Sequence, residues 1–298
     1  MESISTSSKG LRPILTIFQI LALYPLPNHI LNTLYAFASI SVGAWMIISL
    51  LVISPLHVNG SMRVFMSYVV FIIRAILPML IIAQAFFTRL EQTKIFKILS
   101  EIDKTFARNF AKNINYKRLR TKYLVSFFAP LLCLAVIRVY FVYHLIIYHS
   151  DAKFRFYWFH QVQSLIVSRV RCVQVAFYAN LINDRIQWIH FELVQIIAQR
   201  RNVSQQKLQA KIIFLRQIYR MIYDVSALTN KSFGWSLLVI TISYFVDSVG
   251  NCFKYLLVLE KTLPMSDEIS SSVGLISTSI TLITLCYSCG RCADNNPS

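Results

Sequence analysis

Charged residues are scarce in this sequence, and acidic residues are the scarcest. Asp, Glu, Lys and Arg together make up 14% of the 298 residues, with 13 acidic side chains against 30 basic ones. A soluble domain is about 25% charged, whereas hydrophobic residues reach 56% of this chain. The shortage of charge therefore argues against an ordinary soluble domain and indicates a membrane protein.

Glycine, proline and cysteine are also rare, and no linker, low-complexity tract or internal repeat is evident. Four of the six cysteines lie within or beside apolar segments, so no disulfide framework is predicted. The sequence contains no P-loop, GxSxG, HExxH or glycine-rich dinucleotide turn. We therefore expect neither an enzyme nor a bound cofactor.

Six stretches are long and apolar enough to cross a bilayer, which takes about 20 residues of helix. They span about 30–54, 64–88, 123–148, 158–180, 235–259 and 268–289. The fourth is the weakest, because Arg169 and Arg171 interrupt it. The sequence thus predicts an all-α, polytopic transmembrane helical bundle that forms a single membrane domain over 1–298.

The basic residues predict the orientation. The connections 89–122 and 181–234 carry 10 and 8 Lys or Arg, whereas the alternate connections hold only Arg63, Lys153, Arg155 and Lys261. The positive-inside rule places the basic connections in the cytoplasm, with the N-terminal segment 1–29 and the tail 290–298. The charge then faces the anionic leaflet of the plasma membrane rather than nucleic acid. This topology is inverted relative to G-protein-coupled receptors.

Both basic connections show helical periodicity, and we expect them to extend the spans into the cytoplasm as amphipathic helices. Their apolar positions are Ile95, Leu99, Ile102, Phe106 and Phe110 in the first, and Leu208, Ile212, Leu215, Ile218, Ile222 and Val225 in the second. We expect these two faces to pack on each other; the alternative is binding to the membrane surface. The proline-containing stretch within 1–29 is predicted to be a helix at the cytoplasmic interface.

One passage resembles a known family. "LRQIYRMIYDVSALTNKSFGWSLLVITISYF", at 215–245, is similar to the insect gustatory receptors in Tyr219, Asp224, Asn230, Phe233 and Gly234. "LALYPLP" at 21–27 and the fourth span running into "INDRIQWIHFELVQI" are similar as well. Considered as structure alone, Asn230 and Ser232 predict a cap where the fifth helix begins, and Gly234 a close backbone approach.

The resemblance implies an inverted seven-span receptor that is a ligand-gated, non-selective cation channel and assembles as a tetramer. Its small-molecule tastant would bind in the outer half of the bundle. In that family the seventh span lines the pore and carries Thr-Tyr and Gln-Phe, which this sequence lacks. We therefore expect this chain not to conduct alone. The alternatives are a membrane transporter fragment, or a receptor-derived product that is silent or modulates other subunits.

Charges inside the predicted spans are candidate functional residues, because inserting one costs about 3 kcal/mol. Asp247, Arg74, Arg138 and Arg169 lie near the middles of their spans. Either Arg138 or Arg74 is a candidate partner for Asp247. The sequence leaves two interpretations open, a water-filled cavity with a functional charge network and a structural ion pair.

Aromatic and histidine residues gather near the outer ends of the third and fourth spans. Tyr140, Tyr143 and His144 share one helical face, and Tyr157 and His160 lie across a short connection. These five residues are the candidate ligand-binding cluster; the alternative is the interfacial aromatic belt. No spacing requires zinc between His144, His149 and His160, so no metal is predicted.

Two kinds of modification site are also expected. Cys286, Cys289 and Cys292 lie at the cytoplasmic end of the sixth span, where packing or palmitoylation is favoured over metal binding, since a fourth ligand is missing. Asn59 stands in the one sequon predicted to be extracellular, in a short loop near the bilayer.

Overall fold

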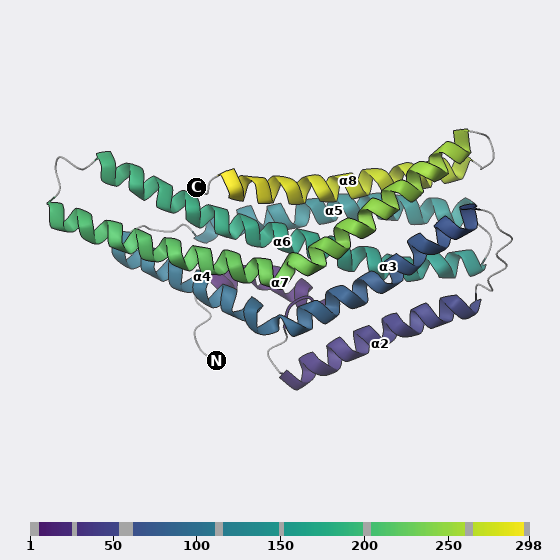
Figure 1. Ribbon diagram of the computed structural model, residues 1–298, viewed down its shortest axis with the longest axis horizontal. Coiled ribbons are helices and arrows are strands. Elements are labelled where there is room, and N and C mark those ends of the chain that lie inside the picture. The colour runs from purple at the N-terminus through teal and green to yellow at the C-terminus, as the bar shows by residue number, and fades with distance from the viewer. Residues whose placement is uncertain are drawn as a thin grey trace.

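A computed structural model describes residues 6–25, 29–53, 62–110, 116–148, 152–198, 204–259 and 265–294. These residues form helices and no strands, which confirms the all-α class. The helices are α1 (Thr6–Ile20), α2 (His29–Ile53), α3 (Met62–Phe87), α4 (Arg89–Phe110), α5 (Tyr116–Tyr148), α6 (Ala152–Ala198), α7 (Gln205–Leu259) and α8 (Met265–Asp294). They run roughly along one long axis (Figure 1).

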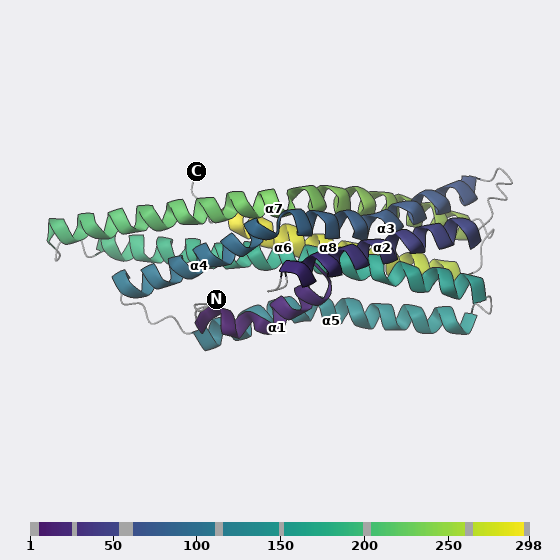
Figure 2. The same cartoon turned by 90° about the horizontal axis from the view of Figure 1, so that it is seen from below.

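Helices α6 and α7 form the centre of the bundle. Helix α7 contacts α3, α4, α6 and α8, and α6 also contacts α3, α5 and α8. Helix α2 packs on α3, and α1 packs on α5; Figure 2 shows the latter pair along the lower edge of the bundle. Helices α3, α5 and α8 thus pack on the two central helices, and α2 packs on the bundle through α3.

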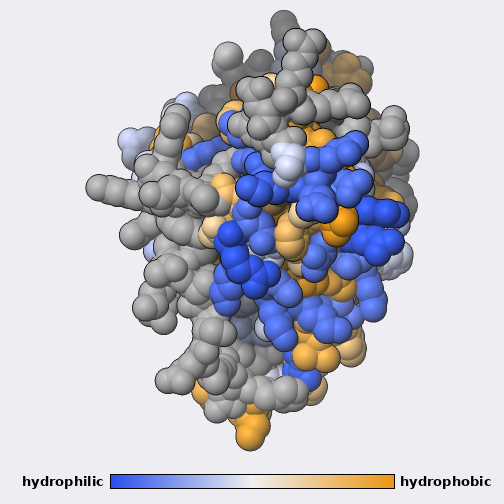
Figure 3. Space-filling view, turned by 90° about the vertical axis from the view of Figure 1, so that its left-hand side faces the viewer, coloured by the Kyte–Doolittle hydropathy of each residue, from blue (hydrophilic) through white to orange (hydrophobic). Residues whose placement is uncertain are grey.

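The fourth and fifth predicted spans continue without a break into the basic connection 181–234. Helices α6 and α7 have 47 and 55 residues, which corresponds to lengths of about 70 and 80 Å at 1.5 Å per residue. Both exceed the bilayer core of about 30 Å. Hydrophilic side chains gather at the end of the molecule that lies on the left in Figure 1 and faces the viewer in Figure 3.

The second predicted span does not continue straight into its basic connection, because α4 leaves α3 at an angle of 60°. Backbone hydrogen bonds continue through this bend: the Thr88 N–H donates to the Gln84 carbonyl, and the Gln92 N–H donates to the Thr88 carbonyl. The bend turns α4 toward α7, with which it packs.

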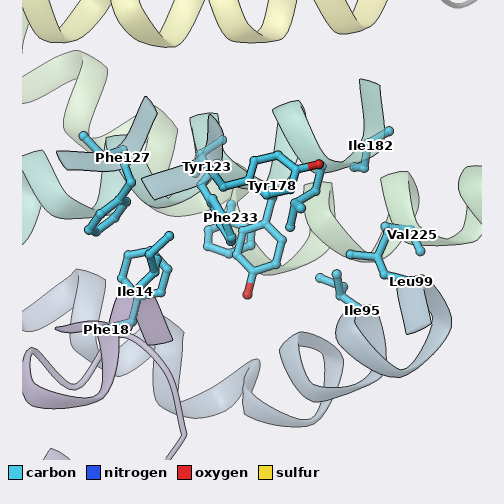
Figure 4. Packing of buried hydrophobic residues seen from close by; sticks show 14 of the residues in the cluster. Ile14, Phe18, Ile95, Leu99, Tyr123, Phe127, Tyr178, Ile182, Val225 and Phe233 are labelled. Carbon is cyan, nitrogen blue, oxygen red and sulfur yellow. The ribbon is translucent and has the colours of Figure 1, made fainter. Parts of the chain in front are cut away.

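The packing of α4 on α7 confirms the expectation that the two amphipathic faces meet. Ile95, Leu99, Ile102 and Phe106 share one buried cluster with Leu215, Ile218, Ile222 and Val225. Figure 4 shows Ile95 and Leu99 of α4 on the same side of this cluster as Val225 of α7. Phe110 and Leu208 are partly buried at its margin. Ile212 is 45% exposed, so its assignment to the buried face was wrong. It lies on the side of α7 that carries exposed Tyr219 and Tyr223.

The expected helix start at Asn230 and Ser232 is also wrong, because α7 is continuous through both residues. The apolar stripe of the cytoplasmic half runs on into Phe233 and Ile240, which are buried, so packing stabilises the helix across this point. A Cβ on Gly234 would meet only its own helix, at Asn230 Oδ1. The close approaches occur elsewhere, at Gly43 against Met79 and at Gly250 against Val70.

The N-terminal segment forms the expected helix and then a buried turn. Ile14, Phe18 and Leu23 are fully buried. The Phe18 ring lies 5.3 Å from Phe127 of α5 and 6.3 Å from Phe177 of α6, centroid to centroid. This segment therefore packs into the bundle; its depth in a bilayer remains a prediction.

The six predicted spans fall within α2, α3, α5, α6, α7 and α8. In the described part of the chain, α6 and α7 are long and apolar enough to cross a membrane, and the bent pair of α3 and α4 qualifies if counted as one span. The number six therefore stays a prediction.

Large exposed apolar side chains on α2, among them Phe37 and Trp45, suit a lipid-facing or subunit-facing surface.

Candidate functional site

The described charged side chains within the predicted spans lie between α3, α6, α7 and α8. Arg169, Arg171 and Asp247 are all buried. Burying such groups is costly, so each is expected to have a polar partner. These charged residues have different partners and therefore form separate sites.

Arg74 of α3 and Asp247 of α7 form an ion pair. Arg74 Nε donates to Asp247 Oδ1 at 2.9 Å, and the two side chains are 15% and 5% exposed. Of the two partners that the sequence suggested for Asp247, the structure brings Arg74 into contact. The Arg138 side chain lies outside the described residues.

Arg169 links α6 to α8 and α7. Its Nη2 donates to Thr278 Oγ1 at 3.1 Å, its Nη1 donates to Thr281 Oγ1, and its guanidinium lies 4.6 Å from the centre of the Tyr244 ring. Both hydroxyls come from neighbouring turns of α8, which places them on one face. The site therefore combines a cation with two hydroxyls and an aromatic face.

Sequence reasoning missed the role of Arg171, which it treated only as an interruption of the fourth span. The side chain is fully buried and bonds to Gln174 of α6 and to Ser232 and Ser236 of α7. Gln174 Nε2 in turn donates to the Leu23 carbonyl at 3.2 Å. This chain of contacts joins α7, α6 and the N-terminal turn. One sequence feature could have predicted part of this network: Arg171 and Gln174 are three residues apart, which places them on one face of the helix.

A second missed network lies in the cytoplasmic half, between α4, α5 and α6. Arg185 forms two hydrogen bonds with Asp103, at 3.2 and 3.0 Å, and a third with the Tyr123 hydroxyl. Asp184 accepts from Tyr123 at 2.6 Å and from Lys122 at 2.5 Å. Burial alone would lower the pKa of Arg185, but Asp103 and its neighbours outweigh burial and raise it. The opposite charges here are balanced within the chain.

The outer aromatic cluster is only partly described. Tyr140 and Tyr143 are 48% and 62% exposed on α5. The side chains of His144, Tyr157 and His160 lie outside the described residues, as does His149. The exposure of the two tyrosines is what an interfacial belt would show. The ligand-binding role of this cluster stays a prediction.

The cysteines lie near the end of α8. Cys286 and Cys289 are exposed, and the Cys292 side chain lies outside the described residues. No metal-binding group of three or more His, Cys, Asp or Glu residues is found in the described part of the chain. Lipidation of these cysteines stays a prediction. Asn59, the predicted glycosylation site, lies outside the described residues.

An all-helical bundle with apolar outer faces and charges buried between its helices defines a class, the helical membrane proteins. Within that class, the sequence pattern of the family described as 7tm chemosensory receptor matches residues 11–297. The chain belongs to this chemosensory receptor family, which confirms the resemblance drawn from 215–245 and supports a chemoreceptor role. No curated protein matches the sequence.

Proposed function

We propose that this chain is a subunit of a plasma-membrane taste receptor of the gustatory type, with its N-terminus in the cytoplasm. In this proposal it binds a small organic tastant and, assembled with like or different subunits as a tetramer, gates a cation path. The family match over 11–297 is the observation that carries the proposal. Long helical extensions on α6 and α7 support it, because they connect the membrane half rigidly to the cytoplasmic half.

The tastant would bind in the outer half of the bundle, against Tyr140, Tyr143, His144, Tyr157 and His160. Phenol and imidazole groups on apolar walls suit a small organic molecule with a few polar atoms. These residues lie on α5 and α6. Binding between two helices can change their packing, which is the first step of coupling.

The Arg74–Asp247 pair would couple the two halves. It holds α3 and α7 at one relative position, because separating the two side chains would break a buried, charge-assisted contact. Helix α7 is continuous from Asp247 to Gln205 and reaches the contact with α4. A shift at the ion pair would therefore move the cytoplasmic packing surface.

The test is expression of the full chain in cells without chemoreceptors, alone and together with other receptor subunits. Cation currents are recorded during application of sugars, amino acids and alkaloids. We expect a ligand-evoked current in at least one combination. Tyr143→Phe and His160→Ala should each raise the half-maximal ligand concentration about tenfold, which corresponds to about 1.4 kcal/mol.

Tyr287→Phe is the matched control, because Tyr287 is exposed on α8 near the opposite end of the predicted span. It should leave the ligand response unchanged. Ligand uptake without current would support the transporter alternative, with Asp247 on the substrate path. Surface expression without current or uptake in any combination would contradict the receptor proposal.

Orientation and assembly need separate measurements. An epitope tag at the N-terminus should bind antibody only after the cells are permeabilised. Cross-linking in intact membranes should give a species of four subunits. Antibody binding to intact cells, or a monomer at all cross-linker concentrations, would contradict these parts of the proposal.

A further inference from the structure

The guanidinium of Arg171 is buried between α6 and α7 and meets neutral acceptors. Its Nε donates to Ser236 Oγ at 3.1 Å, its Nη1 to Gln174 Oε1 at 2.8 Å, and its Nη2 to the Ser232 carbonyl at 3.0 Å. A guanidinium carries five N–H donors, so two remain beyond these bonds. The Phe233 ring lies under the cation at 4.2 Å.

The charge of Arg171 is not balanced by a carboxylate in the described part of the chain. Arg185, on the same helix, shows the contrasting case, because Asp103 lies 3.0 Å from its guanidinium. A fully buried cation with neutral partners alone is costly, since hydroxyl and amide dipoles replace only part of the lost hydration. An anion beside Arg171 would remove that cost.

Two buried hydroxyls near Arg171 have no hydrogen-bond partner among the described residues: Ser232 Oγ and the Tyr178 hydroxyl. Ser232 is the residue whose carbonyl accepts from Arg171. The Tyr178 ring lies 5.0 Å from the Phe233 ring, centroid to centroid, and the same Phe233 ring lies 4.2 Å from the Arg171 guanidinium. Figure 4 shows Tyr178 and Phe233 together in the buried cluster. Such hydroxyls are expected to find a partner.

We propose that Arg171, Ser232 and Tyr178 form a binding site for a small inorganic anion such as chloride. The set offers N–H and O–H donors to one ligand, which selects an anion over a metal cation. All three residues are fully buried, which favours a monatomic ion over a larger organic acid.

The site would stabilise three segments at once. Arg171 and Tyr178 belong to α6, and Ser232 belongs to α7. Gln174 accepts a hydrogen bond from Arg171 and donates one to the Leu23 carbonyl in the N-terminal turn. The anion would therefore hold the N-terminal turn and both central helices in their described arrangement. This role is independent of the tastant and goes beyond the proposed function.

The experiment measures thermal unfolding of the purified full chain in detergent, followed by tryptophan fluorescence. Sodium chloride and sodium bromide are titrated against sodium gluconate at constant ionic strength. We expect a saturable rise in Tm of about 3 °C or more with chloride or bromide, because a ligand of the folded state stabilises it by mass action. Ser232→Ala and Tyr178→Phe should each reduce this rise by at least about half.

The matched control is Ser243→Ala. Ser243 lies on α7, is buried, and also has a hydroxyl without a partner among the described residues, so its loss should leave the chloride response unchanged. Equal melting of the wild type in chloride and gluconate would overturn the proposal and leave water as the partner of both hydroxyls. An unchanged chloride response in both Ser232→Ala and Tyr178→Phe would also overturn it.

Discussion

Buried arginines occur in both halves of α6, but their partners differ. In the cytoplasmic half, Arg185 meets the Asp103 carboxylate through two hydrogen bonds. In the predicted span, Arg171 meets an amide, a hydroxyl and a carbonyl. A balanced ion pair favours one arrangement of its helices, whereas neutral contacts cost less to exchange. On α6, the cytoplasmic half is therefore held by a balanced ion pair, whereas the buried Arg171 of the predicted span has only neutral partners among the described residues.

Arg185→Leu should produce the largest loss, because it leaves Asp103 buried without its cation. We expect the free energy of unfolding to fall by about 3–5 kcal/mol, measured by denaturant unfolding of the purified chain. Asp103→Leu combined with Arg185→Leu should lose less, since no charge is then left unpaired. Glu101→Ala, at an exposed position of α4, is the control and should change stability by less than about 0.5 kcal/mol.

Asp247→Asn tests the balanced pair within the membrane half. The change leaves the Arg74 charge with a neutral partner, and we expect a loss of about 2–3 kcal/mol. A double-mutant cycle with Arg74→Gln should give a coupling energy above about 0.5 kcal/mol. Additive effects of the two changes would show that the pair does not fix the contact of α3 with α7.

Gly250→Ala tests close packing of the same two helices without changing charge. A Cβ at this position would lie 3.0 Å from Val70 Cγ2, and we expect a loss of about 1–2 kcal/mol from overpacking. Val70→Ala should restore part of the loss when combined with it. Gly290→Ala is the control, because a Cβ there would meet nothing within 4 Å; a comparable loss at Gly290 would contradict the packing explanation.

Glu91 and Lys231 should give the smallest effect, at the partly exposed contact of α4 with α7. Their 3.0 Å ion pair is mainly responsible for the lowered pKa of Glu91. Because the folded-state pKa is below the unfolded value, the pair stabilises the fold above about pH 4.3 and loses this contribution as pH falls through the folded pKa.

We expect Glu91→Gln to cost less than about 1 kcal/mol at pH 7. Its melting temperature should converge with that of the wild type as the pH falls to about 3. A difference that persists unchanged at acidic pH would mean that packing, rather than charge, accounts for the effect. Gln217→Glu, exposed on α7, provides a control for adding a carboxylate away from this contact.

The sequence was most informative where a single periodic pattern controlled the outcome. The spacing of Ile95, Leu99 and Ile102 predicted a buried helical face, and the match with Leu215, Ile218 and Ile222 predicted what it packs against. The predicted helix start at Asn230 and Ser232 was wrong. A capping preference is worth about 1 kcal/mol, and packing along a continuous apolar stripe outweighs it.

For the candidate site, the sequence indicated which charges would lie in the membrane, and Arg74 with Asp247 was among the suggested pairs. It did not indicate the partners of Arg171 or the network of Arg185. Those partners are 61 to 82 residues away for Ser232 and Asp103, and no local spacing relates residues so distant. Which side chain meets which therefore depended on how the helices pack.

By itself, the sequence determined that the chain is helical, that it suits a bilayer, and where its amphipathic faces lie, because hydropathy and helical period act over neighbouring residues. Only the tertiary structure decided that α7 is continuous, that α4 turns by 60° to meet it, and that one buried arginine has a carboxylate while another has hydroxyls. These outcomes depend on contacts between distant segments, whose geometry is set by packing.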